Sequence, residues 1–304
     1  MTEADATVDD RTTEEPAAWK RPNPVLKALK SIALLRESWV GMIGAGIILF
    51  WVLVAIFAPL LAPYDPVQLL MPFQPPGTTA PDGGTFWLGS DNLGRDILSR
   101  IIYGSRTVLV YATLATACAY IVGIVMGLAA GYKRGWIDDV LSRVSDIILS
   151  FPILVLYVVI ITTFGPSGIN IVFAVTFASA PGIMRIVRGL TLDLRNRDYV
   201  AAAQTRGEST WHIMLVEILP NARGPLIVDA CLRMGYTTIT IGVLGFLGLG
   251  LPPPTPDWGG MISSTRAMAT FAPYMTVFPA IAISSLVLGL NLIADGLREI
   301  SLRD

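Results

Sequence analysis

A few residues of this 304-residue chain have types and spacings that could support chemistry. The run from Gly89 to Arg95 has the glycine spacing of a phosphate-binding loop, but it lacks the lysine and the serine or threonine of such loops. His212 is the only histidine, and the chain has no H-E-x-x-H and no G-x-S-x-G motif. We therefore expect an irregular loop at 89–95 and no catalytic site, so the chain is not expected to be an enzyme.

Two opposite charges, Asp229 and Arg233, lie in the first half of an apolar segment. Residues four apart on one helix can form an ion pair, and charges inside a membrane are costly and often functional. Two interpretations remain open: a structural pair near the inner membrane boundary, or a pair that lines or gates a pathway. Asn291 and Asp295 leave the same choice in the last apolar segment, where Asp295 is expected to mark the inner boundary.

A short helix is expected after Asp198, which is a good N-cap residue. Ala201 to Ala203 favour helix and carry little bulk, Gly207 is expected to end the helix, and Pro220 to open or kink the next one. Such a small-faced helix, held parallel to the membrane, could seat in a groove on a soluble partner. The alternative is an ordinary amphipathic surface helix.

The composition places these residues in a membrane protein. Charged residues make up 15% of the chain, against about 25% in soluble domains, and the mean hydropathy is +0.60. The only two cysteines, Cys118 and Cys231, lie inside apolar runs, which argues against a disulfide scaffold. The net charge of −1 argues against a nucleic-acid binder.

Six apolar segments are long enough to cross a bilayer as helices. The segments show no strict alternation of apolar and polar residues, so helices are favoured over a barrel. The run 147–184 is too long for one pass, and the Gly and Pro residues at 164–168 predict a hairpin within it. We expect an all-α polytopic membrane protein whose transmembrane helices span about 40–62, 107–130, 145–164, 169–188, 224–249 and 274–296.

The basic residues predict the orientation. Seventeen of the 22 lysines and arginines fall on the side of the two termini, which the positive-inside rule assigns to the cytoplasm. A cytoplasmic tail at 1–38, partly disordered and then basic and amphipathic, would precede a transmembrane domain at 39–304. External loops are expected at 63–106 and 250–273, and a cytoplasmic loop at 190–223. Residues 96–106 have the pattern of a separate interfacial helix.

Four stretches resemble a known family. Ala202-Ala203, Gly207 and Ile218-Leu219-Pro220 resemble the EAA loop of ATP-binding cassette (ABC) importer permeases. The stretches 62–66, 88–106 and 246–259 resemble the second permease subunit of dipeptide and oligopeptide importers, the DppC/OppC type. The resemblance covers roughly residues 30–300 in the same order.

The resemblance implies a type I ABC importer permease fold in the bacterial cytoplasmic (inner) membrane. It implies a sister permease subunit, two ATP-binding subunits that hold ATP and Mg, and an extracytoplasmic substrate-binding protein; no cofactor is expected on this chain. The ATPase would couple through a helix at 198–212. The residues of this coupling segment would be Asp198, Tyr199, Ala201, Ala202, Ala203, Arg206, Gly207, Glu208 and Pro220. A platform for the binding protein would comprise Asp91, Gly94, Arg95, Asp96, Arg100, Pro253, Asp257 and Trp258.

One position departs from the family pattern. Ala201 stands where the family usually has Glu, which three residues after Asp198 would complete a capping-box-like pair and offer a charge to the partner. We expect docking to depend on shape and backbone instead. Arg206 and Glu208 could supply substitute pairing for the ionic contact of this loop.

The substrate is left open by the sequence. The resemblance implies di- or oligopeptides, and related systems are thought to carry nickel, glutathione, opines or sugars. Two other classes of function remain as alternatives: a channel or ion-coupled carrier that works alone, and a membrane-bound assembly or signalling scaffold. Transport by the purified chain without ATP or partners would favour the stand-alone carrier.

Overall fold

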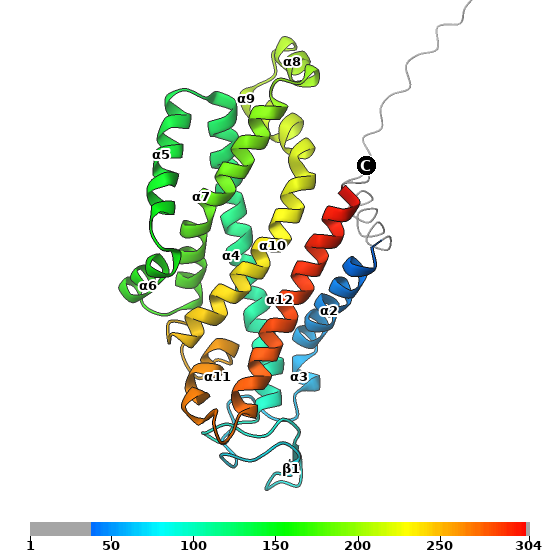
Figure 1. Cartoon of the computed structure of the whole chain (residues 1–304), viewed down its shortest axis with the longest axis vertical. Helices are drawn as coiled ribbons and strands as arrows, with labels where there is room; N and C mark the ends of the chain where they lie inside the picture. The colour runs from blue at the N-terminus through cyan, green and yellow to red at the C-terminus, as the bar shows by residue number, and fades with distance from the viewer. Residues whose placement is uncertain (1–37, 302–304) are drawn as a thin grey trace, which may run out of the picture.

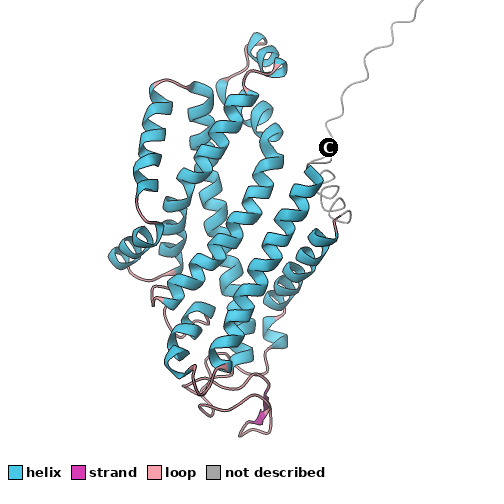
Figure 2. Cartoon of the chain, in the orientation of Figure 1, coloured by secondary structure: helices cyan, strands magenta, loops and turns pink. Residues whose placement is uncertain are grey.

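The computed structural model describes residues 38–301, which form an elongated bundle of helices (Figures 1 and 2). The tail at 1–37, for which a disordered and then amphipathic segment is predicted, lies outside the described residues. The elements in chain order are α2 (Trp39–Ile56), α3 (Ala58–Leu61), β1 (Thr78–Thr79), β2 (Thr85–Phe86), α4 (Ile97–Lys133), α5 (Trp136–Ser150), α6 (Ile153–Phe164), α7 (Gly168–Leu194), α8 (Asp198–Thr205), α9 (Thr210–His212), the π-helix η2 (Ile213–Ile218), α10 (Leu219–Phe246), α11 (Trp258–Thr265), the 3₁₀ helix η3 (Arg266–Met268) and α12 (Tyr274–Ser301).

The bundle has two distinct ends. Figure 1 shows α8 at one end, and α11 and the β1–β2 hairpin at the other. Among the described residues, five helices are long and apolar enough to cross a membrane, and the bent pair α5–α6 makes a sixth crossing if it counts as one span. Large apolar side chains such as Leu49, Ile121 and Ile281 are exposed on these helices. An all-α membrane protein is confirmed.

Glycines allow α4 and α7 to pack closely. Gly123, Gly127 and Gly131 recur every fourth residue on α4, and small residues at this spacing let membrane helices approach. A Cβ atom on Gly127 would lie 2.5 Å from Cβ of Val187 on α7. Equivalent Cβ atoms on Gly123 and Gly131 would meet Ile183 and Thr191 as closely, so this pair of helices has no room for larger side chains along the stripe.

Helices α2 and α12 pack antiparallel in the same way. A Cβ atom on Gly44 would lie 2.7 Å from the carbonyl oxygen of Gly289. Ser38 Oγ accepts a hydrogen bond from the Gly41 backbone N–H, which caps α2, and donates one of 2.9 Å to Glu299 on α12. The indole Nε1 of Trp51 donates to Ser285 Oγ at 3.0 Å, which fixes the register of the two helices.

The expectation of a separate interfacial helix at 96–106 is wrong, because α4 continues without a break from Ile97 to Lys133. The Asp96 carboxylate caps it by accepting the Ser99 backbone N–H at 2.7 Å. Its first turns lie in the core rather than on a surface, since Ile97 and Ile101 are buried against Trp258 and α12. The apolar pattern of these residues reflects protein contacts instead of lipid.

The expectation of a single helix over 145–164 is also wrong. Helices α5 and α6 meet at an angle of 90°, and the break falls at Phe151 and Pro152. Proline lacks the N–H that a continuing helix would need and disfavours helical backbone in the residue before it. Helix α6 therefore lies across the bundle (Figure 1).

The last two long helices differ from expectation at their ends. The fifth segment begins well before 224, because α9, η2 and α10 form one continuous helical stretch from Thr210 to Phe246. Pro220 stands in the first turn of α10, and Pro225 lies inside that helix. The predicted start of the last helix at Tyr274 is confirmed, although the helix continues to Ser301.

Candidate functional site

Helix α8 forms the tip of the bundle. Its N-cap residue is Arg197, so Asp198 is the first helical residue rather than the cap that the sequence predicts. An acidic side chain in the first turn still interacts favourably with the helix dipole. Gly207 follows the helix with φ of +74°, a conformation that glycine adopts easily, and the prediction that Gly207 ends this helix is confirmed.

The helix is held to the bundle by one face. Val200 and Ala203 are fully buried in a core cluster that also contains Ile213, Met214 and Ile218. The Gln204 side chain donates to the hydroxyl of Tyr132 on α4 at 3.2 Å. Helix α8 is thereby fixed to α4, η2 and α10.

The opposite face of α8 is exposed and nearly flat. Ala201, Ala202 and Thr205 are exposed there. Methyl groups and one hydroxyl protrude little, so a second protein surface could approach the backbone of this helix closely. Tyr199 is half-buried and packs against the core cluster that holds α8.

The coupling segment is not one helix. Residues 206–209 separate α8 from α9, and Ser209 caps α9 by accepting the His212 backbone N–H. Arg206 and Glu208 pair with each other, since Arg206 Nη2 lies 2.7 Å from Glu208 Oε1; their substitution for the missing charge at Ala201 toward a partner stays a prediction. His212 and Glu217 join this pair, a contact that the sequence analysis missed, because their convergence depends on the π-helix between them.

Most residues of the predicted binding-protein platform lie at the opposite end of the bundle and are buried. Asp91 accepts hydrogen bonds from the Arg95 backbone N–H at 2.9 Å and from Arg95 Nε at 2.7 Å, and Arg100 donates to the Pro66 carbonyl at 3.0 Å. These bonds fold the 63–96 loop onto the start of α4. Gly94 turns this loop with φ of +85°.

Asp257 and Trp258, at the start of α11, are also buried and make structural hydrogen bonds. The Asp257 carboxylate accepts the backbone N–H groups of Gly259 and Gly260 and so caps α11. Trp258 is 0% exposed, and its indole Nε1 donates to the Ile101 carbonyl at 3.0 Å. The prediction that the platform residues contact a binding protein directly is therefore wrong, except for the exposed Pro253. The other seven residues are buried: Asp91, Gly94, Arg95, Asp96, Arg100, Asp257 and Trp258.

Asp229 and Arg233 do form an ion pair, with 2.7 Å between Arg233 Nε and Asp229 Oδ2. Tyr120 of α4 donates its hydroxyl to the same carboxylate oxygen, a partner that the sequence did not predict. Both charged side chains are about one-quarter exposed or less, and Arg233 reaches Gly182 of α7. The pair thus connects three helices, while a gating role stays a prediction. Asn291 faces Gly235 of α10, and Asp295 is exposed.

Comparison with known families decides the kind of protein. A family model described as the inner membrane component of binding-protein-dependent transport systems matches residues 123–304, which is more than half of the chain. The chain belongs to this family. A second family model, the N-terminal TM domain of oligopeptide transport permease C, matches residues 32–76.

Curated relatives of this family of permeases match nearly the whole chain. The dipeptide transport system permease protein DppC of Alkalihalophilus pseudofirmus is 38% identical over 265 residues, covering 87% of this chain and 86% of the relative. The di/tripeptide permease DppC of Pseudomonas aeruginosa is 38% identical and covers 91% of each chain. The glutathione transport system permease protein GsiD of Pectobacterium atrosepticum is 36% identical, over 84% of this chain and 85% of that one.

Solved structures share the fold. The MetNI methionine ABC transporter in inward-facing conformations matches with a TM-score of 0.56 and 16% identity, over 67% of this chain and 97% of that one. An amino acid ABC transporter with histidines matches with a TM-score of 0.50 and 17% identity, over 68% and 93%. Both matches cover almost all of the other chain, so this chain has an additional part outside the shared bundle.

The chain is therefore a membrane permease subunit of an ABC importer, of the DppC/OppC type. Members of this family work with ATPase and substrate-binding subunits. The expectation drawn from the sequence resemblance is confirmed at this level. The stand-alone carrier and the signalling scaffold receive no support.

Proposed function

We propose that partner ATPase subunits dock on α8 and move this permease through it. Helix α8 lies at the tip of the bundle, is seated by Val200 and Ala203, and presents Ala201, Ala202 and Thr205 to its surroundings. A rigid helix with a small exposed face suits a groove, because close backbone approach compensates for the missing charge at Ala201. This exposed, firmly seated helix is the observation that carries the proposal.

Movement of α8 reaches the rest of the bundle through α10. The core cluster fastens α8 to η2, and η2 continues without interruption into α10, which contacts α4, α7, α11 and α12. The π-helix and the two prolines, Pro220 and Pro225, weaken the regular hydrogen bonding near the start of this lever. ATP and Mg belong to the partner subunits, and this chain provides binding surfaces and mechanical linkage without catalysing hydrolysis.

The α8 end faces the cytoplasm in this proposal, and so do both termini. The excess of lysine and arginine in the tail, the 190–223 loop and the C-terminus supports this orientation. The chain would then reside in the bacterial cytoplasmic membrane and pair with a sister permease subunit, so that the translocation pathway lies between the two chains.

The external binding protein would meet the α11 end. Because the platform residues are buried, the contacting groups are instead the exposed side chains that their loops display. Leu69, Trp87, Leu93 and Phe271 are at least half exposed at this end. Aromatic side chains such as Trp87 and Phe271 are enriched at protein interfaces.

We assign short peptides as the substrate class. The relatives that match most of the chain are permeases for dipeptides, di/tripeptides and glutathione, and glutathione is itself a tripeptide. Import of a labelled dipeptide by the complete complex, in competition with glutathione and with a sugar, measures the preference for short peptides over sugars.

Site-specific cross-linking tests the docking proposal. A photoreactive residue replaces Ala202 at the α8 end or, as a control, the exposed Trp87 at the α11 end, in the full complex in native membranes. We expect the probe at 202 to cross-link an ATP-binding subunit and the probe at 87 to cross-link the binding protein. Cross-linking of the ATP-binding subunit at 87, or of the binding protein at 202, would show the opposite orientation and contradict the proposal.

A further inference from the structure

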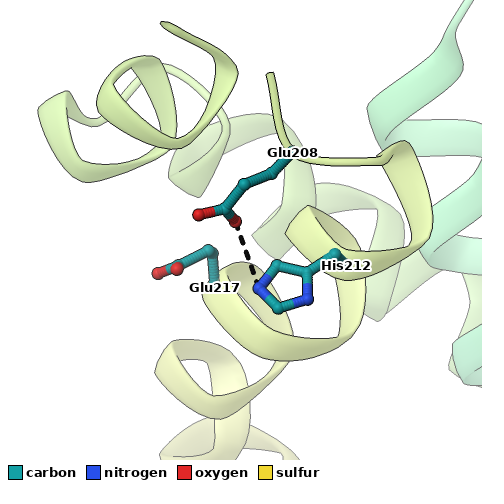
Figure 3. A group of neighbouring side chains, drawn as sticks. All are labelled: Glu208, His212 and Glu217. Carbon is teal, nitrogen blue, oxygen red and sulfur yellow. Dashed lines mark ion pairs between the residues drawn. The ribbon is translucent and has the colours of Figure 1, made fainter. Parts of the chain in front are cut away.

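Three side chains that can ligate metal converge beside α8. Glu208 follows α8, His212 ends α9 and Glu217 lies in η2, and one ligand atom from each lies within 4.8 Å of the others (Figure 3). His212 Nε2 is 3.1 Å from Glu208 Oε2. The two carboxylates are each 22% exposed and the imidazole 46% exposed, so the cluster lies close to the surface of the molecule.

The π-helix creates this convergence. In an α-helix, side chains five residues apart point about 140° away from each other. The wider turn of η2 instead brings His212 and Glu217 toward the same face. Figure 3 shows the His212 imidazole directed at Glu208, with Glu217 beside them. π-helical turns are rare and frequently mark functional sites. The π-helical backbone therefore brings Glu217 close to His212 and Glu208.

The hydrogen bonding leaves ligand atoms available. Arg206 Nη2 contacts Oε1 of Glu208 at 2.7 Å and approaches Oε1 of Glu217 at 3.7 Å, which orients both carboxylates. Glu208 Oε2 is buried, accepts no hydrogen bond from the described residues and faces the imidazole nitrogen. Second partners that orient ligating carboxylates in this manner are common around protein metal ions.

We propose that Glu208, His212 and Glu217 bind a divalent transition-metal ion of the zinc type. One imidazole nitrogen and two carboxylate oxygens suit Zn²⁺ and similar ions, whereas Mg²⁺ and Ca²⁺ prefer oxygen ligands alone. Three protein ligands leave a fourth position for water. The bound ion ties the loop after α8 to the start of the α10 lever and restricts α8, whether or not an ATPase docks there.

Zinc binding to the purified full chain tests this proposal. The protein is prepared in detergent without a histidine tag, with Cys118 and Cys231 replaced by Ser, so that His212 is the only nitrogen ligand of this type and thiols are absent. We expect one saturable Zn²⁺ site per chain, and an affinity at least tenfold lower in His212→Gln and in Glu217→Gln. Asp193→Asn, an exposed acid elsewhere on the molecule, is the control and should bind as the parent does.

Two further readouts separate binding from folding. Zn²⁺ should raise the Tm of the parent and of Asp193→Asn but not that of His212→Gln, because only a ligand of the folded state stabilises it. Co²⁺ should give a visible absorption band in the parent that His212→Gln lacks. Absence of saturable binding in the parent, or equal affinity in parent and His212→Gln, would overturn the metal site.

Discussion

Buried charged side chains at the α11 end make hydrogen bonds within the chain that hold its loops and helix starts together. The clearest case is Asp257, whose carboxylate caps α11 with Arg100 nearby. Burial raises the pKa of Asp257 to about 6, although hydrogen bonds from Gly260 and Gly259 and the charge of Arg100 act in the opposite direction. Asp96, which caps α4, also has a raised pKa because of burial. At both positions desolvation by burial outweighs the effect of the capping hydrogen bonds on the pKa.

The raised pKa of Asp257 predicts a pH-dependent stability. The folded chain holds the carboxyl proton up to about pH 6, and the unfolded chain releases it near pH 4. The folded state thus binds more protons in this window, and stability falls as pH rises from about 4 to about 6. Asp257→Asn keeps a capping side chain and removes the titration.

We expect the Tm of Asp257→Asn in detergent to rise relative to wild type between pH 4 and pH 7. The difference in unfolding free energy is at most about 3 kcal/mol. Thermal unfolding followed by tryptophan fluorescence measures it. Parallel pH profiles for the two proteins would show that Asp257 does not titrate in this range.

The sequence identified these polar residues but not their role. The resemblance to the permease family implied that they form a surface for the binding protein. The bonds from Arg100 to Pro66 and from Trp258 to Ile101 join segments distant in sequence. Such pairings arise only when the loops fold over α4, and no local pattern encodes them.

At the scale of elements, close helix packing depends on glycine. The stripe of Gly123, Gly127 and Gly131 brings α4 and α7 together. In a membrane, association of helices relies on such packing because burial of apolar surface contributes little. One added methyl group at the middle glycine should therefore separate the helices.

The matched pair Gly127→Ala and Gly189→Ala tests this packing. A Cβ at 127 would lie 2.5 Å from Val187 Cβ, whereas no atom of the described chain lies within 4 Å of a Cβ at 189. We expect Gly127→Ala to lose about 1–3 kcal/mol by overpacking and Gly189→Ala to be neutral or slightly stabilised by helix propensity. Denaturation in detergent compares them, and equal stabilities would contradict the packing role.

Features of the helices that depend on neighbouring residues could be predicted from the sequence, whereas features without a distinct local pattern could not. Apolar length, the start at Tyr274 and the end of α8 at Gly207 depend on neighbouring residues and were predicted. The 90° bend at Pro152 was missed because the apolar run continues on both sides of it. The π-helix was missed for a different reason: Ile213–Ile218 carries no composition that distinguishes it from an α-helix.

At the scale of the whole molecule, the two ends are joined by a few long helices. The stretch from Thr210 to Phe246 begins beside α8 and ends near α11. In the proposed mechanism, a displacement at α8 would be transmitted across the membrane-spanning bundle through this stretch. This arrangement explains how a subunit expected to lack an ATP site can respond to ATP bound elsewhere.

Uptake of labelled dipeptide into sealed vesicles tests this central claim most directly. Vesicles contain the complete complex with its binding protein, the complex carrying Ala202→Trp, or this chain alone, with and without ATP on the α8 side. We expect accumulation only with the complete complex and ATP, and at least a tenfold loss with Ala202→Trp while the subunits still assemble. Accumulation by the chain alone, or undiminished uptake with Ala202→Trp, would contradict the account.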